Sequence, residues 1–234
     1  MKNIVLNIPH SSVNGIFDAS IGNWPRNPFF FINDCVNQWT DWWTDMLFTV
    51  PEVENVSKVV FPYSRFVCDA ERLCEDVLER LGHGIIYTEF EGYKRGKLSA
   101  ESKEFLKRLW QKHQDNLKSH LNENSVIVDC HSFPSIKSNN DICIGFNDDW
   151  SCDERLVNDV RKIFKDYGYR VEFNAPYSNS ITPYTGFKYK SLMIEVNKKV
   201  YMNEKLMILK RNPRQWMRWY DCLKKVYERI LEKP

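Results

Sequence analysis

The chain of 234 residues lacks a long hydrophobic run and lacks an excess of either charge. No stretch approaches the roughly 18 apolar residues of a membrane span, and the start, MKNIVLNIPHSS, lacks the hydrophobic region of a signal peptide. The 33 basic and 31 acidic residues are interspersed and leave a net charge of +2. We therefore expect neither a membrane nor nucleic acid as a partner.

The sequence also lacks any Cys-x-x-Cys pair, although it contains seven cysteines. An odd set without such pairs fits neither a zinc ribbon nor a disulfide framework, and it predicts reduced thiols in a cytoplasmic protein. Cys130 adjoins His131, which raises the alternative of a cysteine hydrolase. A small buried strand residue is the favoured interpretation of Cys130.

Short apolar runs that alternate with helical patterns are present instead. They predict strands at 4–8, 56–61, 125–130, 141–146 and 191–196, and helices at 30–48, 99–121, 153–167 and 213–231. We place His113 and His120 on or beside the solvated face of the second helix. The alternation predicts an α/β three-layer sandwich around a central mixed, largely parallel sheet. Because no repeat, low-complexity tract or linker interrupts it, we expect a single domain over residues 1–234.

Two histidines follow predicted strands far apart in the sequence, His10 after 4–8 and His131 after 125–130. Ligands of open α/β sheets gather beyond the carboxyl ends of the strands, so the two imidazoles could share a metal. Catalytic zinc usually takes three protein ligands, and a third must then be found. Asp129 suits a supporting role beside His131. The alternative for each histidine is a hydrogen-bonded loop residue.

A second group of candidate residues is Arg65 with Asp69, Glu71 and Arg72. The planar fork of arginine binds carboxylates with two hydrogen bonds, so an acidic substrate would find partners here. A surface salt-bridge cluster is an equally good interpretation of the same residues.

Glu195 lies inside the apolar run Leu-Met-Ile-Glu-Val-Asn. A buried, unpaired carboxylate would cost several kcal/mol, so a compensating group is needed. A carboxylate beside a metal is what a general base requires. The alternative is a glutamate that faces solvent.

Five short motifs follow one another along the chain. They are Ile-Pro-His10-Ser, Ser64-Arg65 with Asp69-Ala-Glu-Arg72, Asp129-Cys-His131-Ser, Asn174-Ala-Pro-Tyr177 with Gly186, and Ile-Glu195-Val-Asn197 with Tyr201. Together they resemble the N-formylglutamate amidohydrolase family, whose order they keep over roughly residues 4 to 201. The resemblance implies a phosphorylase/hydrolase-like fold, one Zn²⁺ per chain, and hydrolysis of an N-acyl amino acid such as N-formylglutamate.

The resemblance also implies roles for individual residues. His10 and His131 match the metal histidines, and Glu195 matches the glutamate that takes a proton from water. Arg72, with Arg65 as the weaker candidate, matches an arginine that grips the substrate carboxylate. Three further residues are expected at the substrate: Ser11, Tyr177 and Thr182.

The third metal ligand is where the sequence departs from related carboxypeptidases. Those enzymes have His-x-x-Glu at the first ligand, whereas Val13 occupies the glutamate position here. We place the third ligand at Asp69, with Glu71 and Asp45 as alternatives. A peptidase or amidase acting on peptide or cell-wall substrates, and a catalytically silent binding domain of the same fold, are the rival functions. The oligomeric state is not predicted.

Overall fold

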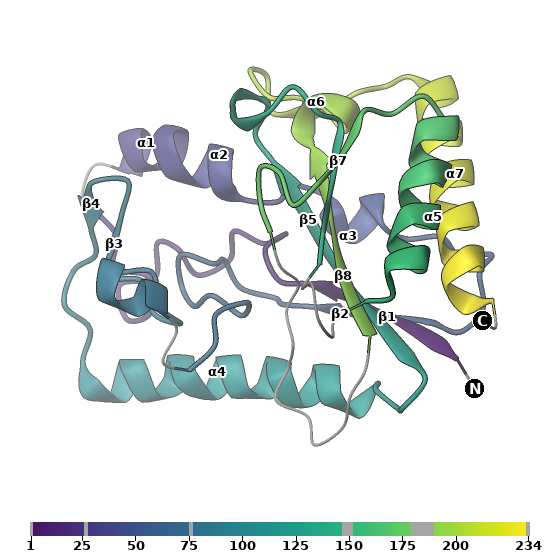
Figure 1. Ribbon diagram of the computed structural model, residues 1–234. Coiled ribbons are helices and arrows are strands. Elements are labelled where there is room, and N and C mark those ends of the chain that lie inside the picture. The colour runs from purple at the N-terminus through teal and green to yellow at the C-terminus, as the bar shows by residue number, and fades with distance from the viewer. Residues whose placement is uncertain (1, 26–27, 75–76, 147–151, 179–189, 233–234) are drawn as a thin grey trace. The chain divides into compact units, whose positions relative to one another are not determined.

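The computed structural model describes residues 2–25, 28–74, 77–146, 152–178 and 190–232 (Figure 1). The chain divides into two compact units. The sheet unit comprises Met1–Ile8, Thr44–Val59 and Leu117–Pro234, and the loop unit comprises Pro9–Trp43 and Val60–Asn116. The expectation of a single domain stays a prediction.

The sheet unit is built on a central sheet that has six strands within the described residues. Their order is β2-β1-β5-β8-β6-β7. Their bounds are β1 (Asn3–Ile8), β2 (Val56–Val60), β5 (Ser125–Phe133), β6 (Ile142–Gly145), β7 (Val171–Phe173) and β8 (Lys190–Asn197). Strand β5 runs parallel to β1 and β8, β6 runs parallel to β7, and β6 is antiparallel to β8. The predicted α/β fold with a mixed, largely parallel sheet is confirmed.

Continuous apolar runs form the central strands because both of their faces are covered. All nine residues of β5 are buried, as are the last five of β1. The predicted strand at 125–130 continues to Phe133, so His131 lies within β5 rather than after it. Strand β7 was not predicted, because three residues give too little pattern to recognise.

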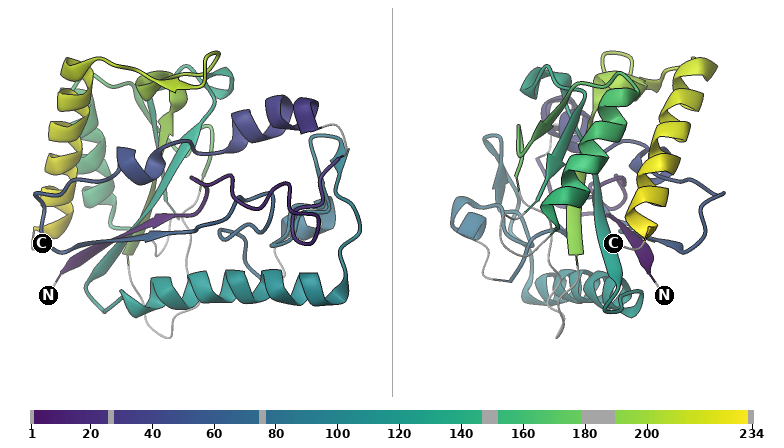
Figure 2. Two further views of the ribbon diagram at one scale, coloured as in Figure 1. Left: turned by 180° about the vertical axis from the view of Figure 1, so that it is seen from behind. Right: turned by 45° about the vertical axis from the view of Figure 1, so that its right-hand side comes forward.

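Helices α5 (Glu154–Asp166) and α7 (Pro213–Leu231) lie side by side against the sheet (Figures 1 and 2). Phe164 stacks on Trp219 with 6.0 Å between the ring centroids. Asn212 caps α7 by accepting from the backbone N–H of Gln215, and the predicted bounds of this helix are correct. The smaller elements of the unit are α3 (Thr44–Leu47), η3 (Ser135–Lys137), α6 (Lys198–Tyr201), β9 (Met202–Asn203) and β10 (Ile208–Leu209).

The loop unit has few regular elements besides one long helix. They are α1 (Pro28–Phe31), the π-helical turn η1 (Ile32–Val36), α2 (Asn37–Trp39), η2 (Val77–Leu81), β3 (Glu89–Phe90), β4 (Tyr93–Lys94) and α4 (Ala100–Ser119). An aromatic cluster around Trp24 and Phe66 forms its core. The Trp24 ring stacks on Phe31 at 4.6 Å, and its Nε1 donates to the Phe66 carbonyl. Side-chain packing, rather than backbone pairing, therefore holds much of this unit.

The predicted helix at 30–48 is wrong as a single element. It ends at Trp39, and Thr40 takes an extended conformation. Trp43 has a left-handed φ of 58°, and the Asp41 N–H donates to the His10 carbonyl. A helical repeat of tryptophans cannot reveal this break, because the competing hydrogen bond comes from a residue about thirty positions earlier.

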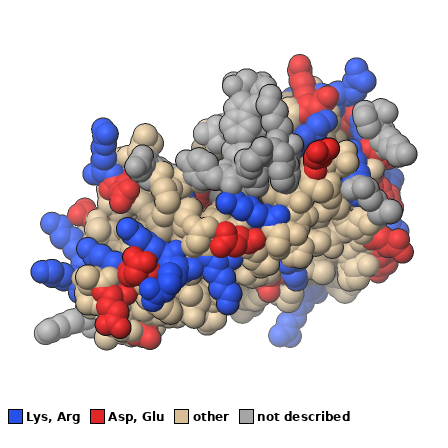
Figure 3. All heavy atoms as spheres, turned by 90° about the horizontal axis from the view of Figure 1, so that it is seen from below, with Lys and Arg blue, Asp and Glu red and all other residues tan. Residues whose placement is uncertain are grey.

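Helix α4 confirms the prediction at 99–121, but the placement of His113 was wrong. His113 is buried with its ring against Phe61, at 5.3 Å between centroids, whereas His120 is exposed as expected. On the face seen in Figure 3, Lys and Arg side chains are interspersed with Asp and Glu. Among the described residues, no helix is both long and apolar enough to cross a membrane.

Candidate functional site

His10 is the centre of a buried polar cluster in the loop unit. It follows β1 after Pro9, and its imidazole is almost fully buried. Its Nε2 lies 2.8 Å from Asp69 Oδ1, while its Nδ1 lies 3.7 Å from Asp41 Oδ2 and 3.8 Å from Glu71 Oε2. Three carboxylates around one imidazole repel one another unless a cation or proton offsets their charge. The cluster is therefore suited to hold positive charge.

Asp69 joins His10 to the two arginines. Its Oδ1 also accepts from the backbone N–H of Glu71 at 2.9 Å, while its Oδ2 faces Arg65 Nη2 at 3.2 Å and Arg72 Nε at 3.7 Å. Burial alone would raise the pKa of this carboxyl, but His10, Arg65 and Arg72 hold the pKa well below its usual range. Asp69 is thus an anion that fixes its neighbours in place.

The two arginines differ in how far they are engaged. Arg65 donates from Nε and Nη2 to the Tyr87 hydroxyl at 3.3 and 3.1 Å, and Tyr87 in turn donates to Asp69. Within the described part of the chain, the ion pair of Arg72 with Asp69, at 3.7 Å, is its only one. The Arg72 side chain is 21% exposed, against 12% for Arg65. The cluster surrounds a fully buried carboxylate, so it is not a solvated surface network.

In the sheet unit, His131 and Glu195 occupy directly paired positions on the parallel strands β5 and β8. Paired positions of neighbouring strands present their side chains to the same face of a sheet, about 4.8 Å apart. Both residues are buried, so Glu195 does not face solvent. Cys143 of β6 pairs with Glu195 on its other side. Burial and Glu195 raise the pKa of the Cys143 thiol to about 11.

Asp129 and Cys130 precede His131 on β5 and have different environments. Asp129, two residues earlier, shares the face of His131, and its Oδ1 accepts from the Asn7 side chain at 2.9 Å. Cys130 is fully buried, and burial followed by Asp129 raises the pKa of its thiol well above the usual value. A nucleophile must reach its thiolate form and the substrate, so Cys130 fits the predicted core position.

The other predicted residues are distributed over both units. Ser11 is half-buried directly after His10 in the loop unit. Tyr177 belongs to the sheet unit, where its carbonyl accepts from the Cys143 thiol. Asp45 lies on α3 of the sheet unit. Thr182 lies outside the described residues.

Three residues of these clusters were missed in the sequence: Asn7, Asp41 and Tyr87. Asn7 could have been found, because a polar residue inside the apolar run 4–8 needs a buried partner and Asp129 is a similar exception in 125–130. Asp41 and Tyr87 do not interrupt an apolar run, because they lie in irregular segments among other aromatic and polar residues. Nothing in the local sequence therefore distinguishes them.

Comparisons with known proteins identify a family and a fold. The family model of N-formylglutamate amidohydrolase matches residues 3–202. The crystal structure of N-formylglutamate amidohydrolase from Ralstonia eutropha JMP134 shares 18% identity, covers 98% of this chain and 95% of that chain, and has a TM-score of 0.77. A gene product from Agrobacterium tumefaciens shares 15% identity over 99% of this chain and 92% of its own, with a TM-score of 0.65.

At these identities the two structures show a common fold, and no curated protein matches the sequence. The family model carries more weight, because it matches most of the chain, over residues 3–202. The chain therefore belongs to the N-formylglutamate amidohydrolase family.

Proposed function

We propose that this protein is a metal-dependent amidohydrolase that cleaves the amide bond of an N-acyl amino acid such as N-formylglutamate. The observation that carries the proposal is the family match over residues 3–202. Family membership supports an amide hydrolase with a small-molecule substrate. The zinc ion, the roles of individual residues and the N-acyl amino acid substrate are our proposals beyond family membership. We also retain one functional domain over residues 1–234, since the match spans segments of both units.

The proposed metal ligands are His10, His131 and Glu71. Two imidazoles and one carboxylate form a donor set that catalytic zinc uses. The loop unit fits a cation, because Asp41 and Glu71 approach His10 Nδ1 from one side. When bound, zinc lowers the pKa of a coordinated water toward about 7 and polarises the amide oxygen.

We favour Glu71 over Asp69 as the third ligand. Asp69 already receives the hydrogen bond at His10 Nε2 and is held by Arg65, which is the arrangement of a carboxylate that orients a metal-binding histidine. Glu71 lies on the Nδ1 side of the same ring, and its side chain is 22% exposed. Asp69 and Asp45 remain the alternatives that the experiment below separates.

Glu195 is the proposed general base. Its pairing with His131 across β5 and β8 brings a buried carboxylate beside a metal ligand. It would take the proton from the attacking water and then pass that proton to the leaving amine. A positioned acid–base group of this kind contributes roughly 10²- to 10⁴-fold to the rate.

Arg72 is the proposed partner of the substrate carboxylate. Arg65 is already engaged by Tyr87 and Asp69, whereas the guanidinium of Arg72 is less committed and more exposed. A two-hydrogen-bond contact with arginine would orient the amino acid part of the substrate. Ser11, Tyr177 and Thr182 are retained as further candidates at the substrate.

The first test is the metal content of the purified protein, measured for the wild type and for His10→Ala and His131→Ala. We expect about one zinc per chain, lost in both variants. His120→Ala is the matched control, since this exposed histidine lies in neither cluster. Wild-type protein that stays metal-free after incubation with zinc would overturn the proposed metal site and favour a silent binding domain.

The third ligand is tested by comparing Glu71→Gln with Asp69→Asn and Asp45→Asn. Loss of a ligand should abolish stoichiometric zinc, whereas loss of an orienting group should weaken zinc affinity by roughly 10- to 100-fold. Equal retention of zinc in Glu71→Gln and wild type would refute Glu71 as the ligand.

Glu195→Gln separates metal binding from catalysis. We expect this variant to keep its zinc and to lose roughly 10²- to 10⁴-fold in kcat on an N-acyl amino acid. A zinc-loaded wild type that hydrolyses cell-wall peptides but no N-acyl amino acid would replace the proposed substrate with that of the rival amidase.

A further inference from the structure

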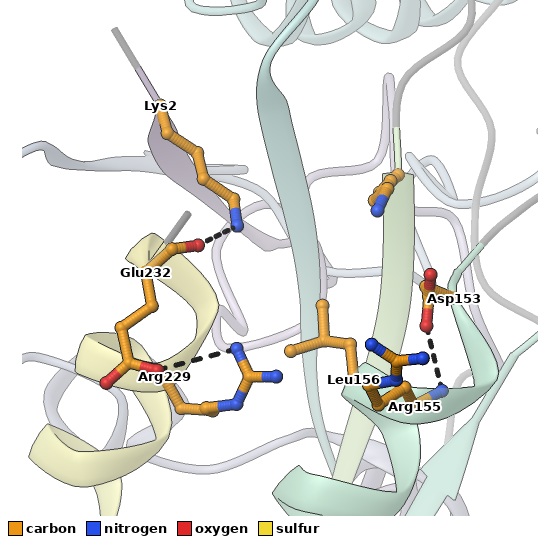
Figure 4. A pocket seen from close by; sticks show the side chains of 7 residues that line it. Lys2, Asp153, Arg155, Leu156, Arg229 and Glu232 are labelled. Carbon is orange, nitrogen blue, oxygen red and sulfur yellow. Dashed lines mark hydrogen bonds and ion pairs between the residues drawn. The ribbon is translucent and has the colours of Figure 1, made fainter. Parts of the chain in front are cut away.

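A pocket of about 270 Å³ lies in the sheet unit at the amino ends of β1 and β8 (Figure 4). Its lining is dominated by charged side chains: Lys2, Asp153, Arg155, Lys190, Arg229 and Glu232, with Leu156. Lys2 immediately precedes β1 and Lys190 begins β8. Lys190 is five residues before Glu195, or about 17 Å along an extended strand. The pocket is therefore separate from the His131 and Glu195 pair.

On one side of the pocket, acidic groups and a backbone carbonyl already offset the positive charges. Arg229 donates from Nε and Nη2 to Asp159 Oδ2, at 2.9 and 2.6 Å, and its Nη1 lies 3.6 Å from Glu232. Lys2 Nζ donates to the Glu232 carbonyl at 2.6 Å. Figure 4 shows Lys2 and Arg229 both reaching Glu232. These contacts fix the end of α7 beside the start of β1.

On the other side, the positive charges of Arg155 and Lys190 are offset less. Within the described residues, no ion pair engages the side chains of Arg155 or Lys190. Asp153 accepts from the Arg155 backbone N–H at 2.8 Å as the cap of α5, so its carboxylate is partly engaged. The partial positive charge at the start of this 13-residue helix adds to the field.

The cations are also close enough to affect one another. Burial lowers the pKa of Lys2, and the charges of Lys190 and Arg229 lower it further. Like charges gathered around a concave site disfavour one another until an anion binds between them. Lysine supplies a compact charge and arginine a planar fork, a combination that suits the oxygens of a phosphate group.

We propose that this pocket is a binding site for a phosphate group, with Arg155 and Lys190 as its principal contacts and Lys2 as a third. The ligand is inorganic phosphate or a small phosphate monoester, and it binds away from the proposed hydrolytic residues. Bound phosphate contacts the starts of β1, β8 and α5 and lies beside the end of α7. Because it binds only the folded chain, it raises the free energy of unfolding of the sheet unit.

Isothermal titration calorimetry at constant ionic strength tests the site, with inorganic phosphate and glycerol 3-phosphate as separate probes. We expect saturable binding of one phosphate group per chain. Arg155→Gln and Lys190→Gln should each weaken it about tenfold or more, because each removes a charge-assisted contact. Lys165→Gln is the matched control, since this exposed lysine lies at the far end of α5 and should leave binding unchanged.

The two probes distinguish the source of the phosphate group. Tighter binding of glycerol 3-phosphate identifies a phosphorylated metabolite, and tighter binding of inorganic phosphate identifies the free ion; either supports the site. No saturable binding at millimolar concentrations overturns the proposal. Binding that survives both pocket variants but is lost in His131→Ala also overturns it, because it places the anion at the hydrolytic residues. None of these outcomes depends on whether the protein hydrolyses amides.

Discussion

The sheet unit and the loop unit are stabilised in different ways. In the sheet unit, apolar strands such as β5 pair along their whole length and are buried on both faces. Within the described residues, the loop unit has only two-residue strands, and buried side chains donate to several of its backbone carbonyls. Arg95 is the clearest case, since it donates to the carbonyls of Gly22, Tyr87, Val67 and Ile21.

This difference has a physical basis. A strand satisfies its backbone groups through its neighbours, so its side chains need only be apolar and of suitable size. An irregular segment lacks such partners, and each buried carbonyl needs its own donor. The loop unit should therefore be sensitive to the loss of single polar groups, while the sheet unit should tolerate small apolar changes.

The largest expected effect is that of Arg95→Met. The Arg95 guanidinium lies over the Trp24 ring, 5.7 Å from its centroid. Methionine retains an apolar side chain but leaves buried carbonyls without their donor, which should lower the free energy of unfolding by about 3 kcal/mol or more. Urea denaturation measures the change, and hydrogen exchange should show the greatest loss of protection in residues 9–43 and 60–116.

Arg108→Met is the matched control, because the Arg108 side chain is 62% exposed and its ion pair with Glu104 is 4.0 Å long. It should change stability by less than about 0.5 kcal/mol. Equal effects of the two substitutions would remove the contrast between the units.

His113 gives the loop unit a dependence on pH. Burial, followed by the charge of His10, lowers the pKa of His113 to about 4 from 6.5. The unfolded chain binds a proton below pH 6.5 while the folded chain does not, so stability is full above that pH and falls toward pH 4. The loss should total about 3 kcal/mol at most.

His113→Gln should reduce this slope between pH 6.5 and 4, as measured by urea denaturation at several pH values. His120→Gln should retain it, because His120 is exposed. An unchanged slope in His113→Gln would mean that other groups account for the acid sensitivity.

Apart from the control, the smallest expected effect is that of Ile127→Val on β5. Ile127 is fully buried against Leu121, and removal of one methylene from such a position costs about 1 kcal/mol. The change should leave pairing along β5 unaffected. A loss as large as that of Arg95→Met would show that the sheet unit is no more tolerant than the loop unit.

The fold could be predicted where the backbone follows a sequence period. The strands at β1, β5 and β8 and the helices α4, α5 and α7 were all recognised, since each buries a regular face or run. The helix predicted at 30–48 is broken in the structure, because the Asp41 N–H donates to the His10 carbonyl instead of continuing the helix. His113 was misplaced although it shares the apolar stripe of α4 with Leu106, Trp110 and Leu117, because a polar residue type outweighed that helical spacing.

For the candidate site, the sequence determined the residue types, their order and the family, because short motifs keep chemical groups together along the chain. It also placed His10 and His131 toward the carboxyl ends of strands, since strand direction follows from the α/β alternation. Only the tertiary structure decided that Asp69 binds His10 and Arg65, that Glu71 lies on the opposite side of the imidazole, and that Asn7 pairs with Asp129. These choices depend on distances between side chains remote in sequence, and no local pattern encodes such distances.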